Sequence, residues 1–85
     1  MAEEQIIMFT MPGCPSCHRA KQYFAEKGVP FEERSVDDAE HRRQLIEDYK
    51  SRATPTIVAG DEMIVGFDQE KIDALFASRG TAEAG

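Results

Sequence analysis

The chain has 85 residues, enough for one small domain with a modest hydrophobic core. It carries 10 Lys and Arg against 16 Asp and Glu, a formal net charge of −6, whereas a nucleic-acid-binding protein usually presents a basic face. No apolar run approaches the roughly 20 residues of a membrane-spanning helix, and residues 1–4 lack the basic and apolar regions of a signal peptide. Composition therefore predicts a single cytoplasmic domain over residues 1–85, without nucleic-acid or membrane partners.

The first half of the chain predicts a strand, a helix and a second strand. Residues 6–9 form a continuous apolar run, typical of a strand buried on both faces. A helix is predicted over residues 15–27, because apolar residues recur there at helical spacing and Pro15 suits the first helical turn. Gly28 suits the position just after a helix end. Residues 31–36 are the second strand candidate.

The middle of the chain predicts a second helix followed by a hairpin. Asp37 is expected to start the helix, because Glu40 three residues later resembles a capping box. Residues 56–59 and 63–65 are apolar, and the turn signal at residues 60–61 between them predicts a β-hairpin.

A last helix is predicted after Asp68, which suits the N-cap position. Residues 80–85 are small and are expected to fray. The predicted order is β-α-β-α-β-β-α. Since a βαβ unit gives a parallel strand pair and a hairpin an antiparallel one, the chain predicts an α/β fold with one four-stranded mixed sheet flanked by three helices.

Both cysteines lie in the motif Cys14-Pro15-Ser16-Cys17, between the first strand and the first helix. Free N–H groups and the positive end of the helix dipole stabilise a thiolate at such a position, and the thiolate is the reactive form. Cys14, at the helix start, is the predicted nucleophile. Cys17, one turn further in, is the predicted resolving thiol that attacks a mixed disulfide at Cys14. A structural disulfide is disfavoured, because so short a loop hardly constrains the unfolded chain.

A metal site is the main alternative for this motif. Zinc usually takes four nitrogen or sulfur ligands, and besides the two cysteines the chain offers only His18 and His41. We therefore expect no metal, and we interpret His18 as a surface residue rather than a general base. Arg19 and Lys21 either stabilise the thiolate and attract an anionic thiol substrate, or are ordinary surface charges.

Two further segments hold candidate binding residues. Cis bonds make up only about 5–6% of X–Pro bonds, so the base rate predicts a trans bond at Thr54-Pro55. In a second interpretation, a bend at this proline exposes the backbone N–H and C=O of Thr54, with which an extended peptide or tripeptide substrate would pair. Phe67 is either a core residue or a contact for a partner. Asp68 either caps the last helix or stands beside free N–H groups that hold a carboxylate.

Together these residues resemble the glutaredoxin family of the thioredoxin fold. The resemblance covers about residues 5–78. Its most specific part is the C-P-S-C-H-R-A-K string that begins at Cys14, and it also includes Lys27-Gly28-Val29, Phe31, Thr54-Pro55 and Gly66-Phe67-Asp68.

The resemblance implies a thioredoxin/glutaredoxin fold with a cis Pro55, in which Cys14 attacks and Cys17 resolves. It implies glutathione as co-substrate, lying across the dithiol and pairing with the backbone of Thr54, with its carboxylate near Phe67 and Asp68. The expected protein is a monomeric dithiol–disulfide oxidoreductase that reduces protein disulfides or glutathione mixed disulfides and is recharged by glutathione or thioredoxin reductase.

The resemblance leaves two other functions open. One is a redoxin that supplies electrons to ribonucleotide reductase and is recharged by thioredoxin reductase. Such proteins usually carry a Trp-Ser-Gly-Phe-Arg-Pro segment, of which this chain matches only Gly66-Phe67. The other is an iron–sulfur or metal carrier that uses Cys14. Pro15 argues against this carrier, because cluster-binding members usually lack proline there.

The chain departs from the family's usual residues around the expected site. The departures bear on contacts with glutathione and leave the dithiol intact. They are Ser16 in place of Tyr, Met11 in place of a Lys that contacts glutathione, Thr54 in place of Val, and Val65-Gly66 in place of Gly-Gly.

Overall fold

The structure, a computed structural model, describes residues 6–60 and 62–79. Its elements follow one another in the predicted order. They are β1 (Ile6–Thr10), α1 (Pro15–Glu26), β2 (Glu32–Ser35), α2 (Ala39–Asp48), β3 (Thr56–Ala59), β4 (Glu62–Val65) and α3 (Gln69–Arg79). The tail predicted at 80–85 and residue 61 of the predicted turn lie outside the described residues. Within the described ranges, no helix has the length and apolar character needed to cross a membrane.

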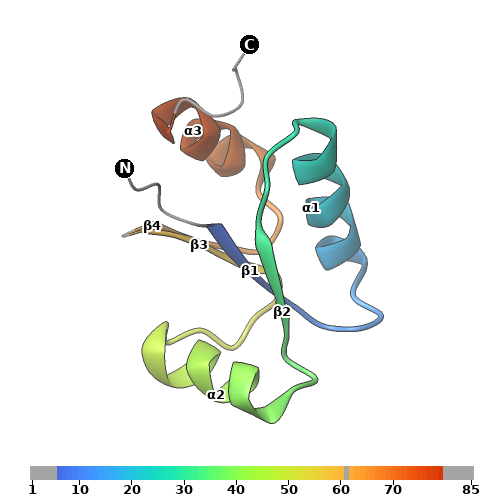
Figure 1. Ribbon diagram of the computed structural model, residues 1–85, viewed down its shortest axis with the longest axis vertical. Coiled ribbons are helices and arrows are strands. Elements are labelled where there is room, and N and C mark those ends of the chain that lie inside the picture. Colours follow the sequence, from blue (N-terminus) through green and yellow to red (C-terminus); the bar gives the residue numbers. More distant parts are fainter. Residues whose placement is uncertain (1–5, 61, 80–85) are drawn as a thin grey trace.

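The strands form one mixed sheet in the order β2-β1-β3-β4 (Figure 1). β1 runs parallel to β2, with Ile7 opposite Glu32, and antiparallel to β3, with Met8 opposite Ile57. β4 returns antiparallel to β3. The parallel pair from β1-α1-β2 and the β3–β4 hairpin confirm the predicted four-stranded mixed sheet.

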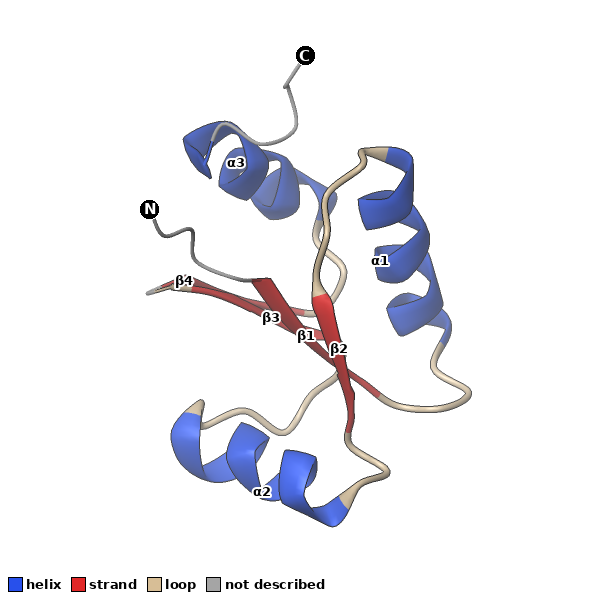
Figure 2. Ribbon diagram, in the orientation of Figure 1, coloured by secondary structure: helices blue, strands red, loops and turns tan. Residues whose placement is uncertain are grey.

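Helices cover both faces of this sheet, α1 and α3 on one side and α2 on the other (Figure 2). Successive side chains of a strand point to opposite faces. On β1, Met8 therefore packs in the same cluster as Phe24 of α1 and Ile72 of α3. The next residue, Phe9, packs in a smaller cluster with Leu45 of α2. The larger cluster thus anchors α1, the helix at whose start the two cysteines lie.

Both ends of α1 follow from local sequence. Pro15 occupies the first helical position, where its missing N–H removes no helix hydrogen bond. Lys27 is the C-cap, and Gly28 follows in the left-handed region at φ 69°, where glycine carries no steric penalty. The prediction of a helix over 15–27 is confirmed to within one residue.

The start of α2 corrects the sequence-based expectation. Asp38, not Asp37, is the N-cap, and its side chain accepts hydrogen bonds from the backbone N–H groups of Glu40 and His41. The physical reason is the turn after β2, in which the N–H of Asp37 donates to the Ser35 hydroxyl over 3.2 Å. That turn uses one more residue before the helix begins, and β2 is one residue shorter at each end than expected.

Candidate active site

Cys14 caps the start of α1 with its own sulfur. The residue is the N-cap, in an extended conformation, and its Sγ accepts a hydrogen bond from the backbone N–H of Cys17 over 3.1 Å. Its carbonyl accepts from the N–H of His18, also over 3.1 Å. An N-cap side chain usually offers an oxygen to these free N–H groups. Here a sulfur takes that place, where donors and the helix dipole both favour negative charge.

The two thiols have opposite acid–base character. Desolvation acts to raise the pKa of the Cys14 thiol, but hydrogen bonds from the Cys17 side chain and backbone, and then from Thr54 and Ser16, outweigh it and lower the pKa. Burial raises the pKa of the Cys17 thiol, and its hydrogen bond with Cys14 acts in the same direction. Cys17 is only 2% exposed, whereas Cys14 is partly exposed. Cys14 is therefore the thiol that ionises first and that solvent reaches.

The segment before β3 brings Thr54 against Cys14. The Thr54 hydroxyl lies 3.9 Å from Cys14 Sγ, and the Thr54 carbonyl oxygen lies 4.0 Å from the same sulfur. The Thr54-Pro55 bond is cis. The trans bond expected from the base rate is wrong, and the cis form implied by the family resemblance is correct. The base rate concerns X–Pro bonds in general, whereas here Pro55 is buried and its carbonyl accepts from the N–H of Gly66 over 2.7 Å.

Buried hydroxyl groups brace this segment. The hydroxyls of Ser51 and Thr56 are 2.9 Å apart, and the Thr56 hydroxyl also lies 2.6 Å from the carbonyl of Ala53, to which it donates. The N–H of Ala53 points back to the Ser51 hydroxyl over 3.4 Å. Both hydroxyl residues are buried, and a satisfied buried polar network rigidifies its surroundings. No short-range sequence pattern indicated this network.

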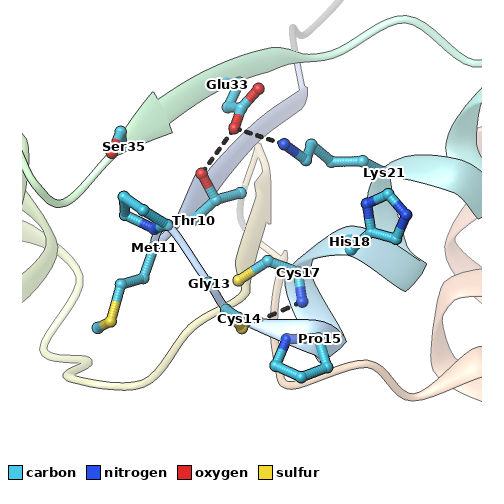
Figure 3. A pocket seen from close by; sticks show the side chains of 11 residues that line it. Thr10, Met11, Gly13, Cys14, Pro15, Cys17, His18, Lys21, Glu33 and Ser35 are labelled. Carbon is cyan, nitrogen blue, oxygen red and sulfur yellow. Dashed lines mark hydrogen bonds and ion pairs between the residues drawn. The ribbon is translucent and has the colours of Figure 1, made fainter.

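A pocket of about 440 Å³ opens beside the cysteines (Figure 3). Its wall comes from the end of β1, the loop after it, the first turns of α1, and β2, and does not include Thr54. Met11, 48% exposed, lies at this wall together with His18 and Ser35. The pocket is therefore open to solvent and reaches both sulfurs.

A charged pair, Lys21 and Glu33, lies in the wall of this pocket (Figure 3). The Thr10 hydroxyl donates to Glu33 Oε2 over 2.8 Å, and Lys21 Nζ lies 3.0 Å from the same oxygen. The hydrogen bond from Thr10, and then that from Lys21, lowers the pKa of Glu33. Lys21 thus pairs with a carboxylate. Sequence analysis missed Thr10 and Glu33, because only the parallel pairing of β1 and β2 brings them to the helix.

The remaining predicted site residues lie outside this pocket. Phe67 packs edge-on against Tyr23, with ring centroids 5.9 Å apart, at the margin of the larger core cluster. The Asp68 carboxylate accepts from the backbone N–H of Lys71 over 3.2 Å, as expected of an N-cap for α3. Arg19 is exposed on α1 and does not line the pocket.

The histidines considered as metal ligands lie apart. His18 is exposed on α1, whereas Nδ1 of His41 lies 3.0 Å from the carbonyl of Ser35. Over residues 6–60 and 62–79, no group of three or more His, Cys, Asp or Glu side chains is placed to hold a metal ion.

This sheet, and a dithiol at the start of α1, define a small redox protein of the thioredoxin/glutaredoxin fold with a CxxC active site. Residues 6–64, more than half of the chain, match the sequence model of the Glutaredoxin family. The chain belongs to the glutaredoxin family and is a glutaredoxin-like thiol–disulfide oxidoreductase.

The proteins similar to this chain include both glutaredoxins and thioredoxin-like redoxins. The chain is 33% identical over 81 residues to a glutaredoxin of Pseudomonas aeruginosa, covering 86% of this chain and 96% of that one. It is 39% identical to the solved thioredoxin-like protein BC3987, with a TM-score of 0.80 and coverage of 84% and 99%. NrdH-redoxin from Escherichia coli, described as a glutaredoxin-like protein with a thioredoxin-like activity profile, is 28% identical, with a TM-score of 0.73 and coverage of 84% and 93%.

Proposed function

We propose that the protein reduces protein disulfides or glutathione mixed disulfides, with Cys14 as attacking thiolate and Cys17 as resolving thiol. The observation that carries this proposal is the hydrogen bond of 3.1 Å from the Cys17 N–H to Cys14 Sγ at the start of α1. Cys14 is therefore a partly exposed thiol whose pKa is lowered, and the buried thiol of Cys17 lies one helical turn away.

The reaction transfers two electrons from the dithiol to the substrate. The Cys14 thiolate attacks one sulfur of the substrate disulfide, forms a mixed disulfide and expels the other sulfur as a thiolate. Cys17 then gives up its proton and attacks Cys14 Sγ. This step releases the second substrate sulfur as a thiolate, which takes up a proton, and leaves a Cys14–Cys17 disulfide. The raised pKa of Cys17 keeps it protonated, and unreactive, until the mixed disulfide forms.

Glutathione is the first candidate for recharging that disulfide, as co-substrate. Two glutathione molecules supply the two electrons and leave as glutathione disulfide. We propose that the backbone of Thr54, beside cis Pro55, pairs with the glutathione chain, and that Phe67, Asp68 and Arg19 border its charged ends. The closeness of the Thr54 carbonyl to Cys14 Sγ, 4.0 Å, supports this placement.

Thioredoxin reductase is the second candidate, in a protein that supplies electrons to ribonucleotide reductase. Two observations favour it. The family's usual glutathione-contacting Lys is replaced by Met11, which is exposed at the pocket. The similarity also extends to NrdH-redoxin, with its thioredoxin-like activity profile. In either case we propose a cytoplasmic monomer that acts on disulfide-bearing proteins.

Single-cysteine variants test the mechanism. We expect Cys14→Ser to abolish reduction of a model disulfide, and Cys17→Ser to accumulate a mixed disulfide at Cys14 that mass spectrometry detects. Cys17→Ser keeps the backbone N–H that faces Cys14, so it serves as the matched control for folding. Full activity of Cys14→Ser would overturn the proposal.

The electron donor is tested on the oxidised protein. Its rate of reduction is compared with glutathione and with thioredoxin reductase plus NADPH, at matched electron supply. A faster reaction with glutathione favours the first candidate, and a faster reaction with thioredoxin reductase favours the second. Iron and absorbance measurements on protein purified without oxygen test the carrier alternative, for which we expect neither bound iron nor colour.

A further inference from the structure

We propose that the side-chain hydroxyl of Thr54 is a hydrogen-bond donor that holds the Cys14 sulfur in its ionised form. This role deepens the proposed function and rests on Cys14 being the attacking sulfur. It differs from the backbone contact with glutathione implied by the family, since it needs the Thr54 side chain and no ligand. The family's usual Val at this position has no such donor.

The geometry offers Cys14 two different partners on one residue. Thr54 Oγ1 lies 3.9 Å and the Thr54 carbonyl oxygen 4.0 Å from Cys14 Sγ, both within the longer range of sulfur hydrogen bonds. A thiol can donate to the carbonyl. A thiolate has no proton to donate, so only the hydroxyl, as donor, favours its charge. Removal of the hydroxyl alone would therefore shift the balance toward the thiol.

The backbone that carries this hydroxyl is held in place without any substrate. Ser51 and Thr56, both buried, form the brace on either side of Thr54 in the sequence. The carbonyl of Pro55, next to Thr54, accepts from the N–H of Gly66 over 2.7 Å. A donor that is already oriented costs little reorganisation when charge develops on the sulfur.

Thr54 also bears on the pKa of the resolving cysteine. A hydrogen bond from Thr54 acts to lower the pKa of Cys17, against the stronger effect of burial, which raises it. It acts to lower the pKa of Cys14 too, together with the Cys17 donors. Thr54 is thus a donor from outside α1 that acts to lower the pKa of both thiols, and its hydroxyl lies 3.9 Å from Cys14 Sγ.

The test compares Thr54→Val, which removes the hydroxyl but keeps the branched shape, with Thr54→Ser, which keeps the hydroxyl. The rate of Cys14 alkylation by iodoacetamide is followed across pH on the reduced dithiol protein, with mass spectrometry counting the singly modified species. In Thr54→Val we expect the midpoint to move to higher pH, with the rate on its acid side about three- to tenfold lower. Thr54→Ser should stay close to the wild-type profile.

The high-pH plateau separates this role from a structural one. A fully ionised sulfur of higher pKa is intrinsically at least as nucleophilic, so the Thr54→Val plateau should equal or exceed that of the wild type. A lower plateau in Thr54→Val, a profile that coincides with the wild type, or a Thr54→Ser profile that matches Thr54→Val would each overturn the proposal. Thermal unfolding of both variants establishes that they are folded before the comparison.

The alkylation profile needs neither glutathione nor a reductase. A protein that shows the Thr54 effect but reduces no disulfide would contradict the proposed function and leave this inference standing. If instead the protein reduces disulfides through Cys14 but the Thr54→Val alkylation profile is unchanged, the proposed function stands and the inference about Thr54 is contradicted.

Discussion

Two regions meet at the cysteines, and they are built differently. On one side, the segment from Ser51 to Thr56 is held by buried hydroxyls and places Thr54 against Cys14. On the other, the pocket is bordered by exposed Met11 and by an ion pair whose side chains are 38% and 40% exposed. Buried hydrogen bonds are costly to break, and exposed ion pairs are not. The braced segment therefore suits control of the sulfur's charge, and the pocket suits contact with exchangeable partners.

The largest expected effect concerns the two sulfurs that these regions share. At neutral pH we expect Cys14 to be alkylated more than about a hundredfold faster than Cys17, because Cys14 has the lowered pKa and Cys17 is buried. As pH falls through the pKa of Cys14 in the folded protein, its rate falls, and so does the stability that its ionised form contributes above the pKa of an unfolded Cys. Peptide mapping after brief alkylation checks the order. Equal labelling of both residues would contradict it.

The next effect is a break in the braced segment. Thr56→Val leaves the Ser51 hydroxyl and the Ala53 carbonyl without their partner, and we expect the free energy of unfolding to fall by about 1–3 kcal/mol. Denaturant unfolding measures it. Ser51→Ala is the companion variant, which removes the other hydroxyl of the brace. A loss below about 0.5 kcal/mol in both, the range of ordinary surface changes, would mean that the segment is not held in this way.

A smaller effect is expected from a new charge at the pocket. Met11→Lys restores the residue usual in the family, and we expect the KM for glutathione in recharging to fall about tenfold, since a charge-assisted hydrogen bond contributes roughly 1.5–3 kcal/mol. Met11→Leu, which adds no charge, is the control. An unchanged KM with Met11→Lys would mean that glutathione does not reach this side of the dithiol.

The smallest effect is the loss of the ion pair. Lys21→Met removes the partner of Glu33, and we expect a loss of stability below about 1 kcal/mol that shrinks further with added salt. The pKa of Glu33 should rise only part of the way to its ordinary value, because the hydrogen bond from Thr10 is the larger cause of its lowering. A loss comparable to that of Thr56→Val would remove the contrast between the two regions.

Sequence reasoning predicted the elements and the dithiol because both depend on local patterns. The apolar run of β1, the break before Cys14 and the helical spacing of α1 are neighbours in the chain. Asp38 shows the limit of such patterns, since two adjacent acids compete for one cap and the turn after β2 decides between them. The cis bond at Pro55 came only from the family resemblance.

The contacts around the sulfurs were beyond sequence reasoning. Thr54 meets Cys14 across 40 positions of the chain, and Thr10 meets Glu33 across 23. Both contacts depend on strand register and on the path of a loop, which no local pattern specifies. The family resemblance implies a role only for the backbone of Thr54, because the family's usual Val at this position has no hydroxyl.

The sulfur that caps α1 is also the sulfur consumed when the pair oxidises. In a Cys14–Cys17 disulfide it carries no charge and accepts hydrogen bonds only weakly, so the helix loses an anionic cap on oxidation. By a thermodynamic cycle, whatever the first turn of α1 gains from that cap in the dithiol state appears as a greater electron affinity of the disulfide. The free energy by which the Cys14 thiolate stabilises the first turn of α1 is therefore also a contribution to the reduction potential of the protein.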